Sequence, residues 1–186
     1  MLAASAQGLV DKIHWSGATP FNSQFIADAL GPEWNGKFLV NAEFNLLDSK
    51  GPDNQLFLQL LKKYQSKCAS CFGSFGQMGI LVGKVVGYTL LALPANQLTQ
   101  KGVNAAFLKI KNFKSDMWCA PWYYGDLKSH TANITDRTVT PVNHHFVQKE
   151  GCFKIANVDK QVAQAHADEQ RYQLTSGTSW PPVPGQ

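Results

Sequence analysis

Apolar residues are densest in the segment Phe75–Leu93, where they occupy nearly every side of the helix that their spacing predicts. A helix that is apolar almost all round is expected to be buried. Gly73, Gly76 and Gly79 stand at its start. Their spacing differs from that of a phosphate-binding loop and indicates a chain that enters the helix close to another segment.

Two short apolar runs predict strands. Asp11–Trp15 leads into the tight loop Ser16–Pro20, and Lys37–Phe44 contains several apolar residues in a row. Such a run is typical of a strand buried on both faces of a parallel sheet. Amphipathic helices are predicted at Asn54–Tyr64, with Asp53 as its N-cap, and after Thr99. The alternation of strands and helices places the chain in the α/β class.

The pattern changes after Asn112. Aromatic residues cluster between Trp118 and Tyr124, short strands are predicted at Thr138–Thr140 and His145–Gln148, and a helix is predicted at Val158–Arg171. Two interpretations of the aromatic cluster stay open, namely stacking on sugars or single-stranded nucleic acid and packing in a small core. The predicted strands are too few to cover a helix as apolar as Phe75–Leu93. We therefore expect that part of the sheet that covers this helix is not in this chain.

Composition narrows the possible functions. The chain has 186 residues, 44% of them hydrophobic and 16% charged, with a net charge of +4. The basic residues are scattered, whereas nucleic-acid binding calls for a concentrated basic face, so no nucleic-acid partner is predicted. The apolar runs are too short and too interrupted to cross a bilayer, and residues 1–10 lack the features of a secretory signal. We therefore expect a soluble chain.

Four cysteines leave several interpretations open. Cys68 and Cys71 form a C-x-x-C in a polar connector, for which a metal site, a redox site and an inert or disulfide-linked loop are all considered. Cys119 and Cys152 flank the aromatic and hairpin region, where a disulfide is sterically feasible, with free thiols as the alternative. We predict the disulfide.

No catalytic motif is present. The chain contains no nucleophile elbow, zinc-protease helix, dinucleotide fingerprint or nucleotide-binding P-loop. His144 and His145 are adjacent, and adjacent residues on a strand point to opposite faces, which argues against a shared metal. We predict no enzyme activity, no metal and no cofactor.

Several segments in order, from about residue 2 to about residue 160, resemble the branched-chain amino-acid-binding family of type I periplasmic substrate-binding proteins, the solute receptors of ABC importers. The segments that carry the resemblance are Gly8-Leu9, Trp15–Pro20, Trp34–Lys37, Gly51–Gln55, Leu61–Tyr64, Gly73–Gly79, Val103–Phe107, Asn112–Asp116 and Asp136–Pro141. The resemblance implies two α/β lobes with Rossmann-like parallel sheets, of which this chain is only the C-terminal half.

The same resemblance implies a division of the chain. Residues 1–72 correspond to part of the second lobe, 73–112 to helices that return to the first lobe, 113–172 to hinge-side β segments and a C-terminal helix, and 173–186 to a flexible tail. It also implies a periplasmic protein that closes over an amino acid or similar small molecule and delivers it to a membrane permease. A sensory or regulatory domain of the same fold, signalling to a partner protein, is the alternative. Because the chain corresponds to half of the family's fold, we expect exposed apolar faces and self-association.

Five residues are predicted to contact the ligand on the strength of this resemblance. Ser16 and Thr19 belong to the loop that lines the cleft in the family, where some relatives carry an acidic residue that meets the ligand ammonium. Phe75, Gln77 and Met78 stand where the chain passes between lobes, and they offer apolar and polar contacts. The alternatives are a purely structural turn at Thr19 and core packing for Phe75 and Met78.

Overall fold

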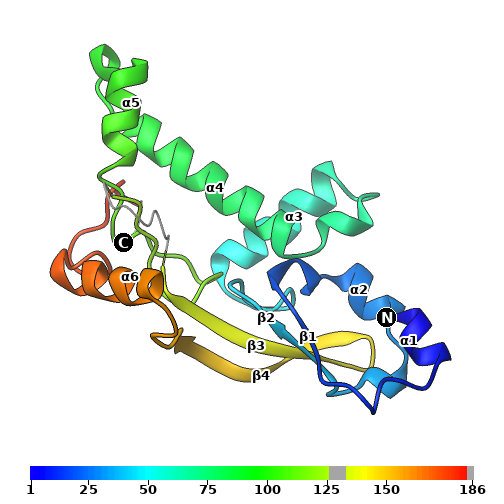
Figure 1. Ribbon diagram of the computed structural model, residues 1–186. Coiled ribbons are helices and arrows are strands. Elements are labelled where there is room, and N and C mark those ends of the chain that lie inside the picture. Colours follow the sequence, from blue (N-terminus) through cyan, green and yellow to red (C-terminus); the bar gives the residue numbers. More distant parts are fainter. Residues whose placement is uncertain (126–132, 184–186) are drawn as a thin grey trace. The chain divides into compact units, whose positions relative to one another are not determined.

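The structure is a computed structural model, and it describes residues 1–125 and 133–183 (Figure 1). Its α-helices are α1 (Leu2–Ala6), α2 (Gln24–Ala29), α3 (Pro52–Tyr64), α4 (Ser74–Leu91), α5 (Gln100–Phe107) and α6 (Lys160–Arg171). Its strands are β1 (Trp15–Gly17), β2 (Phe38–Asn41), β3 (Thr135–Val142) and β4 (His145–Lys154). Short 3₁₀ turns are η1 (Thr19–Phe21), η2 (Pro32–Trp34), η3 (Ala69–Cys71) and η4 (Ala95–Gln97).

The chain divides into two compact units. Unit 1 comprises residues 1–79, 116–119 and 136–153, and unit 2 comprises residues 80–115, 120–135 and 154–186. Unit 1 contains the strands β1 and β2 and nearly all of the β3–β4 hairpin. Unit 2 contains most of α4 together with α5 and α6.

The sheet is mixed rather than parallel throughout. Its strand order is β1-β2-β3-β4, and β1 runs parallel to β2 with Trp15 opposite Phe38. The strand β3 runs antiparallel to β2, with Val40 opposite Val139. The strands predicted at Thr138–Thr140 and His145–Gln148 are present and longer than expected.

Burial along β2 alternates, so the prediction of a strand covered on both faces is wrong. Phe38 and Val40 are buried, whereas Leu39 and Asn41 are exposed. The buried face packs against α1 and the segment around Trp34, and no second layer of the described residues covers the other face. The apolar run Lys37–Phe44 marks the position of the strand, but β2 itself is shorter, at Phe38–Asn41, and the run does not indicate how many layers cover it.

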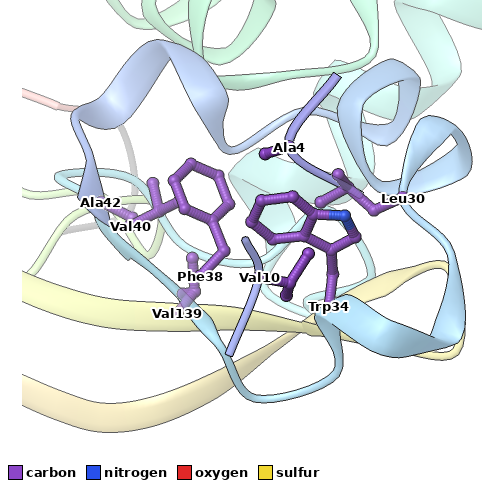
Figure 2. Packing of buried hydrophobic residues seen from close by; sticks show 8 residues of the cluster. All are labelled: Ala4, Val10, Leu30, Trp34, Phe38, Val40, Ala42 and Val139. Atoms are coloured by element: carbon purple, nitrogen blue, oxygen red, sulfur yellow. The ribbon is translucent and has the colours of Figure 1, made fainter. Parts of the chain in front are cut away.

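The core of unit 1 is built around a buried tryptophan, Trp34 (Figure 2). Its ring lies edge-on to Trp15 with the centroids 5.3 Å apart and edge-on to Phe38 at 6.3 Å. Its indole Nε1 donates a hydrogen bond to Ser5 Oγ at 2.8 Å, so the only polar atom of the ring has a partner. Aromatic pairs of this geometry add stability beyond the area that they bury. The residues of the cluster are Ala4, Val10, Leu30, Trp34, Phe38, Val40, Ala42 and Val139.

Helix α3 begins two residues earlier than predicted, and its first N–H groups are bonded by a distant segment. Gly51 is the N-cap and Pro52 the first helical residue, so Asp53 lies in the first turn and is not the cap. The Asp116 carboxylate accepts the backbone N–H of Asp53 at 2.7 Å and that of Asn54 at 3.4 Å. A long-range carboxylate thus satisfies the free N–H groups at the positive end of the helix.

Helix α4 is apolar but is not buried all round. Every fourth residue forms its buried row, which consists of Gln77, Leu81, Val85 and Thr89. Other apolar side chains are exposed, among them Phe75 at 64% and Leu91 at 83% of their surface. The prediction of complete burial is therefore wrong for the described chain. No helix among the residues described is long and apolar enough to cross a membrane.

Unit 2 is held together by backbone bonds between distant segments. Thr99 caps α5 as predicted, with its Oγ1 accepting the Gly102 N–H at 3.1 Å. Lys111 and Trp180 exchange two backbone hydrogen bonds of 3.0 Å. Trp180 belongs to the segment 173–186 predicted to be a flexible tail, so this part of the segment is bonded to the rest of unit 2. Residues 184–186 lie outside the described part. In the aromatic cluster, Tyr123 is buried and Tyr124 is 41% exposed.

The glycines at the start of α4 differ in how closely other atoms approach them. A Cβ at Gly76 would overlap the Cys71 carbonyl oxygen and lie 2.9 Å from Phe57, and one at Gly73 would lie 2.6 Å from Ser23 Cβ. A Cβ at Gly79 would meet nothing within 4 Å. The prediction of close approach holds for Gly73 and Gly76 and fails for Gly79.

This difference predicts opposite effects of the same substitution. Gly76→Ala should destabilise the protein by about 1–3 kcal/mol because the backbone of η3 or the Phe57 ring must move. Gly79→Ala should leave stability unchanged or raise it by up to about 1 kcal/mol, since alanine is the better helix former. Urea unfolding monitored by circular dichroism measures both. Equal effects of the two substitutions would contradict the packing described here.

Candidate functional site

The candidate site lies in unit 1 where β1 and β2 end. Thr19 is the first residue of η1, directly after β1. Its Oγ1 donates to the Asn41 carbonyl at 3.3 Å and accepts the Glu43 N–H at 3.4 Å. The hydroxyl therefore joins the ends of the two parallel strands, and one lone pair is left for a further contact.

Ser16 lies within β1 rather than in the loop after it. It is opposite Leu39 of β2 and is exposed. Its hydroxyl is thus accessible from one face of the sheet, two residues before the turn that carries Thr19.

The first turn of α4 is attached to the loop between β1 and α2. Ser23 and Gly73 form an isolated β-bridge, and the Asn22 carbonyl accepts both the Ser74 N–H at 3.1 Å and the Ser74 hydroxyl at 3.2 Å. Phe75 follows and is mostly exposed, and Met78 is half-buried. The structure thereby brings the loop that contains Thr19 to the start of α4, as the prediction of a shared site requires.

Gln77 is fully buried, and its amide group is bonded within the protein. Nε2 donates to the Asn45 carbonyl at 3.1 Å and to Asn54 Oδ1 at 2.9 Å. Asn54 in turn donates to the Leu47 carbonyl at 2.9 Å and the Ser49 carbonyl at 2.9 Å. Among the described residues, Gln77 Oε1 has no hydrogen-bond partner. In this arrangement Gln77 anchors the loop after β2 to α4.

A buried pair of charged residues stands at the start of β3. Arg137 is 4% and Asp136 is 7% exposed. Arg137 Nη1 donates to Asn45 Oδ1 at 2.5 Å, and the Asp136 carboxylate accepts the Arg137 N–H at 2.8 Å. Burial raises the pKa of Asp136, although hydrogen bonding and the nearby guanidinium oppose this, and burial lowers the pKa of Arg137.

Glu43 adds a second carboxylate to this edge of the sheet. Glu43 as a whole is exposed, but its carboxyl group is partly shielded from water. This desolvation raises the pKa of Glu43, and repulsion by the Asp136 charge raises it further. Two acidic groups therefore share the edge with one buried guanidinium. Among the described residues, no group of three or more histidine, cysteine or acidic residues is placed to hold a metal ion.

An open pocket of about 360 Å³ lies elsewhere in unit 1. It is lined by Asn22, Gln24, Leu47, Asp48, His145 and Phe146. None of the five predicted ligand residues lines it. This pocket is therefore distinct from the candidate site at the ends of β1 and β2.

Sequence reasoning missed the polar residues that organise this edge, which are Asn45, Asn54, Asp136 and Arg137. Asn45 follows the predicted strand Lys37–Phe44, and two of its partners are 32 and 92 positions away in the sequence. Asp136 and Arg137 directly precede the β-branched run Thr138–Thr140. Two adjacent charges next to a predicted strand were the one sequence feature that could have indicated a buried ion pair here. The structure also bonds Cys119 to Cys152 and Cys68 to Cys71.

Replacing Glu43 by glutamine tests the electrostatics of this edge. Because the native pKa of Glu43 is raised above its unfolded value, the native state loses stability as the pH rises from the unfolded pKa through the native one. Glu43→Gln should therefore raise the melting temperature at about pH 7, and the gain should vanish below about pH 4. Glu150→Gln, at an exposed position of β4, is the control and should show no such dependence. A gain that persists unchanged at low pH would contradict the assignment.

Comparison with protein-family models gives no match, and neither does comparison with curated protein sequences. Solved structures do match. One is a branched-chain amino acid ABC transporter protein from Thermus thermophilus with bound valine, with a TM-score of 0.66 and 17% identity. It is matched over 89% of this chain and 44% of its own. Another is a fatty acid ABC transporter substrate-binding protein from Thermomonospora curvata, with a TM-score of 0.61 and 17% identity, matched over 88% of this chain and 41% of its own. The chain therefore spans less than half the length of these proteins, and over that span it has the fold of a type I periplasmic binding protein.

Proposed function

We propose that this chain is part of the solute-binding component of an ABC importer and that its solute is an amino acid or a similar small molecule. The observation that carries the proposal is the structural likeness to ABC transporter substrate-binding proteins over nearly nine-tenths of the chain. One of these proteins holds valine, and another is named for fatty acids. Their shared fold supports solute binding as a class, and the amino acid is the finer part of the proposal.

The proposed ligand contacts are those predicted from the sequence, with distinct roles. Ser16 offers an accessible hydroxyl, and Thr19 offers the remaining lone pair of its Oγ1. Phe75 supplies an exposed ring for an aliphatic side chain, with Met78 beside it in the helix. Gln77 is buried, and its proposed role is to fix the loop after β2; a direct contact would require a solute group to reach its buried Oε1.

Glu43 supplies the acidic group that Thr19 does not. Its backbone N–H is bonded to Thr19 Oγ1, so the two residues are neighbours at the ends of β1 and β2. An ammonium group bound at this position would favour the charged form of Glu43 and offset the effect that raises its pKa. This arrangement favours a zwitterion over a fatty acid.

The proposed mechanism is closure of two lobes over the solute, followed by delivery to a membrane permease. Solute contacts from both lobes stabilise the closed state relative to the open one. The proposed location is the periplasm, and the two disulfides agree with an oxidising compartment. No bond chemistry is proposed.

A ligand titration tests the proposal. Leucine, isoleucine or valine should shift the amide resonances of Thr19, Glu43 and Phe75 in nuclear magnetic resonance spectra. Ligand should also raise the melting temperature because it binds only the folded state, by an amount equivalent to about 2.7 kcal/mol at a hundredfold excess over the dissociation constant. Phe75→Ala should reduce both responses with little change in the stability of the free protein, since the ring is exposed.

Leu91→Ala is the matched control. Leu91 is another exposed apolar residue of α4, beyond the proposed contacts, and its loss should leave the ligand response intact. The panel also includes other amino acids, amides, short peptides and a fatty acid. A response to fatty acid alone would exclude the amino-acid proposal, and no response to any of these solutes would exclude solute binding by this chain.

We also propose that the chain self-associates through its exposed apolar surface. Helix α4 exposes Val82, Leu90 and Leu91, and β1 stands at the edge of the described sheet. Exposed apolar faces and free strand edges favour association. Light scattering coupled to size-exclusion chromatography should show species larger than 20.5 kDa that increase with concentration.

Leu91→Asp should shift that distribution toward the monomer. Val158→Asp changes a residue of similar exposure outside α4 and should leave the distribution unchanged. A wild-type protein that is monomeric at every concentration would contradict the proposal.

A further inference from the structure

The environment of Arg137 is unusual for a buried cation. Nη1 donates to the neutral oxygen of Asn45 at 2.5 Å, and Nη2 lies 3.3 Å from Cys119 Sγ and 3.5 Å from Cys152 Sγ. Nε has no hydrogen-bond partner among the described residues. The Asp136 carboxylate lies nearby, but the hydrogen bond recorded for it comes from the Arg137 backbone N–H. The side-chain bonds of this guanidinium thus end on an amide oxygen and on the two sulfurs of a disulfide.

Disulfide sulfurs are poor partners for such a group. They are neutral and accept hydrogen bonds weakly, whereas a thiolate is an anion that a neighbouring arginine stabilises. The charge of Asp136 already favours the charged form of Arg137, but Nη2 itself faces the two neutral sulfurs. Reduction of the Cys119–Cys152 bridge would place a second negative charge directly beside Nη2, so the guanidinium favours the reduced form relative to the disulfide. Cys119 Sγ also lies 3.6 Å from the Asp136 carbonyl oxygen, a weaker contact that favours a thiol over a thiolate.

We propose that the Cys119–Cys152 bridge is a site of thiol–disulfide exchange with small thiols. Cys152 is exposed and Cys119 is half-buried, so an incoming thiolate attacks Cys152 Sγ. The S–S bond breaks, a mixed disulfide forms on Cys152, and Cys119 leaves as a thiolate beside Arg137 Nη2. A second thiol displaces the first from Cys152. In total two small thiols become one small disulfide, and the bridge gains two electrons; Cys152 takes up one proton, and the other is released to solvent because Cys119 stays a thiolate beside Arg137.

The exchange would act on the edge of the sheet described above. The bridge joins β4 to the residue after Trp118, and Trp118 forms an isolated β-bridge with Phe44. Asn45, the next residue after Phe44, holds Arg137 through its side chain and Gln77 through its carbonyl. Opening the bridge therefore removes a covalent tie from the segment that positions Asn45. The exchange itself does not depend on the proposed solute-binding function.

The second disulfide of the chain is an internal control. The Cys68–Cys71 bridge lies in an exposed connector, and its recorded contact in the described structure is between Cys68 Sγ and Ser70 Oγ at 3.6 Å. The chain contains one other arginine, Arg171, which lies over the ring of Tyr172. Any effect of Arg137 on reduction should therefore be confined to the Cys119–Cys152 bridge.

The test is equilibration of the whole chain in buffers of reduced and oxidised glutathione, followed by alkylation and peptide mass spectrometry of each bridge. Arg137→Gln should raise the ratio [GSH]²/[GSSG] needed for half-reduction of Cys119–Cys152 by about tenfold or more, as expected for the loss of one charge-assisted bond. Asn45→Asp should shift the midpoint in the same direction, because it gives the guanidinium a carboxylate partner. Arg137→Lys should retain a midpoint close to that of the wild type. The Cys68–Cys71 midpoint should stay unchanged in all three variants.

Arg171→Gln serves as the charge-matched control and should alter neither bridge. Circular dichroism first establishes which variants are folded, because Asn45→Asp loses the side-chain donor to Ser49 Oγ and the Asp116 carbonyl. A variant that unfolds makes both bridges easier to reduce and is set aside. Arg137→Lys, which keeps the charge, then decides by comparison with the wild type, with Asn45→Asp as a second comparison where it folds.

Two results would overturn the proposal. One is a Cys119–Cys152 midpoint that is the same in the wild type and in folded Asn45→Asp. The other is an Arg137→Lys midpoint shifted as far as that of Arg137→Gln.

Discussion

The geometry of unit 1 depends on the hydrogen bonds of one asparagine, Asn45, at the end of the segment that follows β2. Its side-chain nitrogen donates to Ser49 Oγ at 2.9 Å and to the Asp116 carbonyl at 3.2 Å, and its side-chain oxygen accepts from Arg137. Its own carbonyl accepts from Gln77. Three segments that are far from Asn45 in the sequence, at Gln77, Asp116 and Arg137, thus converge on this single residue. In a low-dielectric interior such a network stabilises one arrangement strongly, because each broken bond leaves a polar group without water.

This network explains why the residues predicted to touch a ligand divide into two kinds. Thr19 and Gln77 already use most of their hydrogen-bonding capacity within the protein. Ser16 and Phe75 are exposed and have few fixed contacts. The first pair therefore fixes the positions of the strand ends and of the start of α4, and in our proposal the exposed second pair makes the larger contact with the solute. Preorganisation of this kind lowers the entropy lost on binding.

Sequence reasoning found what local chemistry determines. Thr99 and the apolar spacing after it gave α5, and the ordered motifs gave the fold. It fails where distant residues decide. The sequence predicts Asp53 as a cap, whereas the Asp116 carboxylate bonds the first N–H groups of α3, and it predicts full burial of α4, whereas part of that helix is exposed. The apolar residues of a segment indicate how much of its surface is expected to be buried, but not whether the same chain buries it. The sequence likewise does not indicate that Arg137 is buried beside Asn45.

The exposed character of the candidate site has a consequence for affinity. The described chain spans less than half the length of the binding proteins that it resembles, and its candidate contacts lie on an open edge. A solute bound to one such edge keeps water on its opposite side, where charged and polar contacts are weak. Closure by a second lobe would exclude that water and strengthen the proposed contact between Glu43 and an ammonium group. Specific recognition by this fold therefore requires that the edge be rigid before closure, and the bonds around Asn45 and Thr19 supply that rigidity.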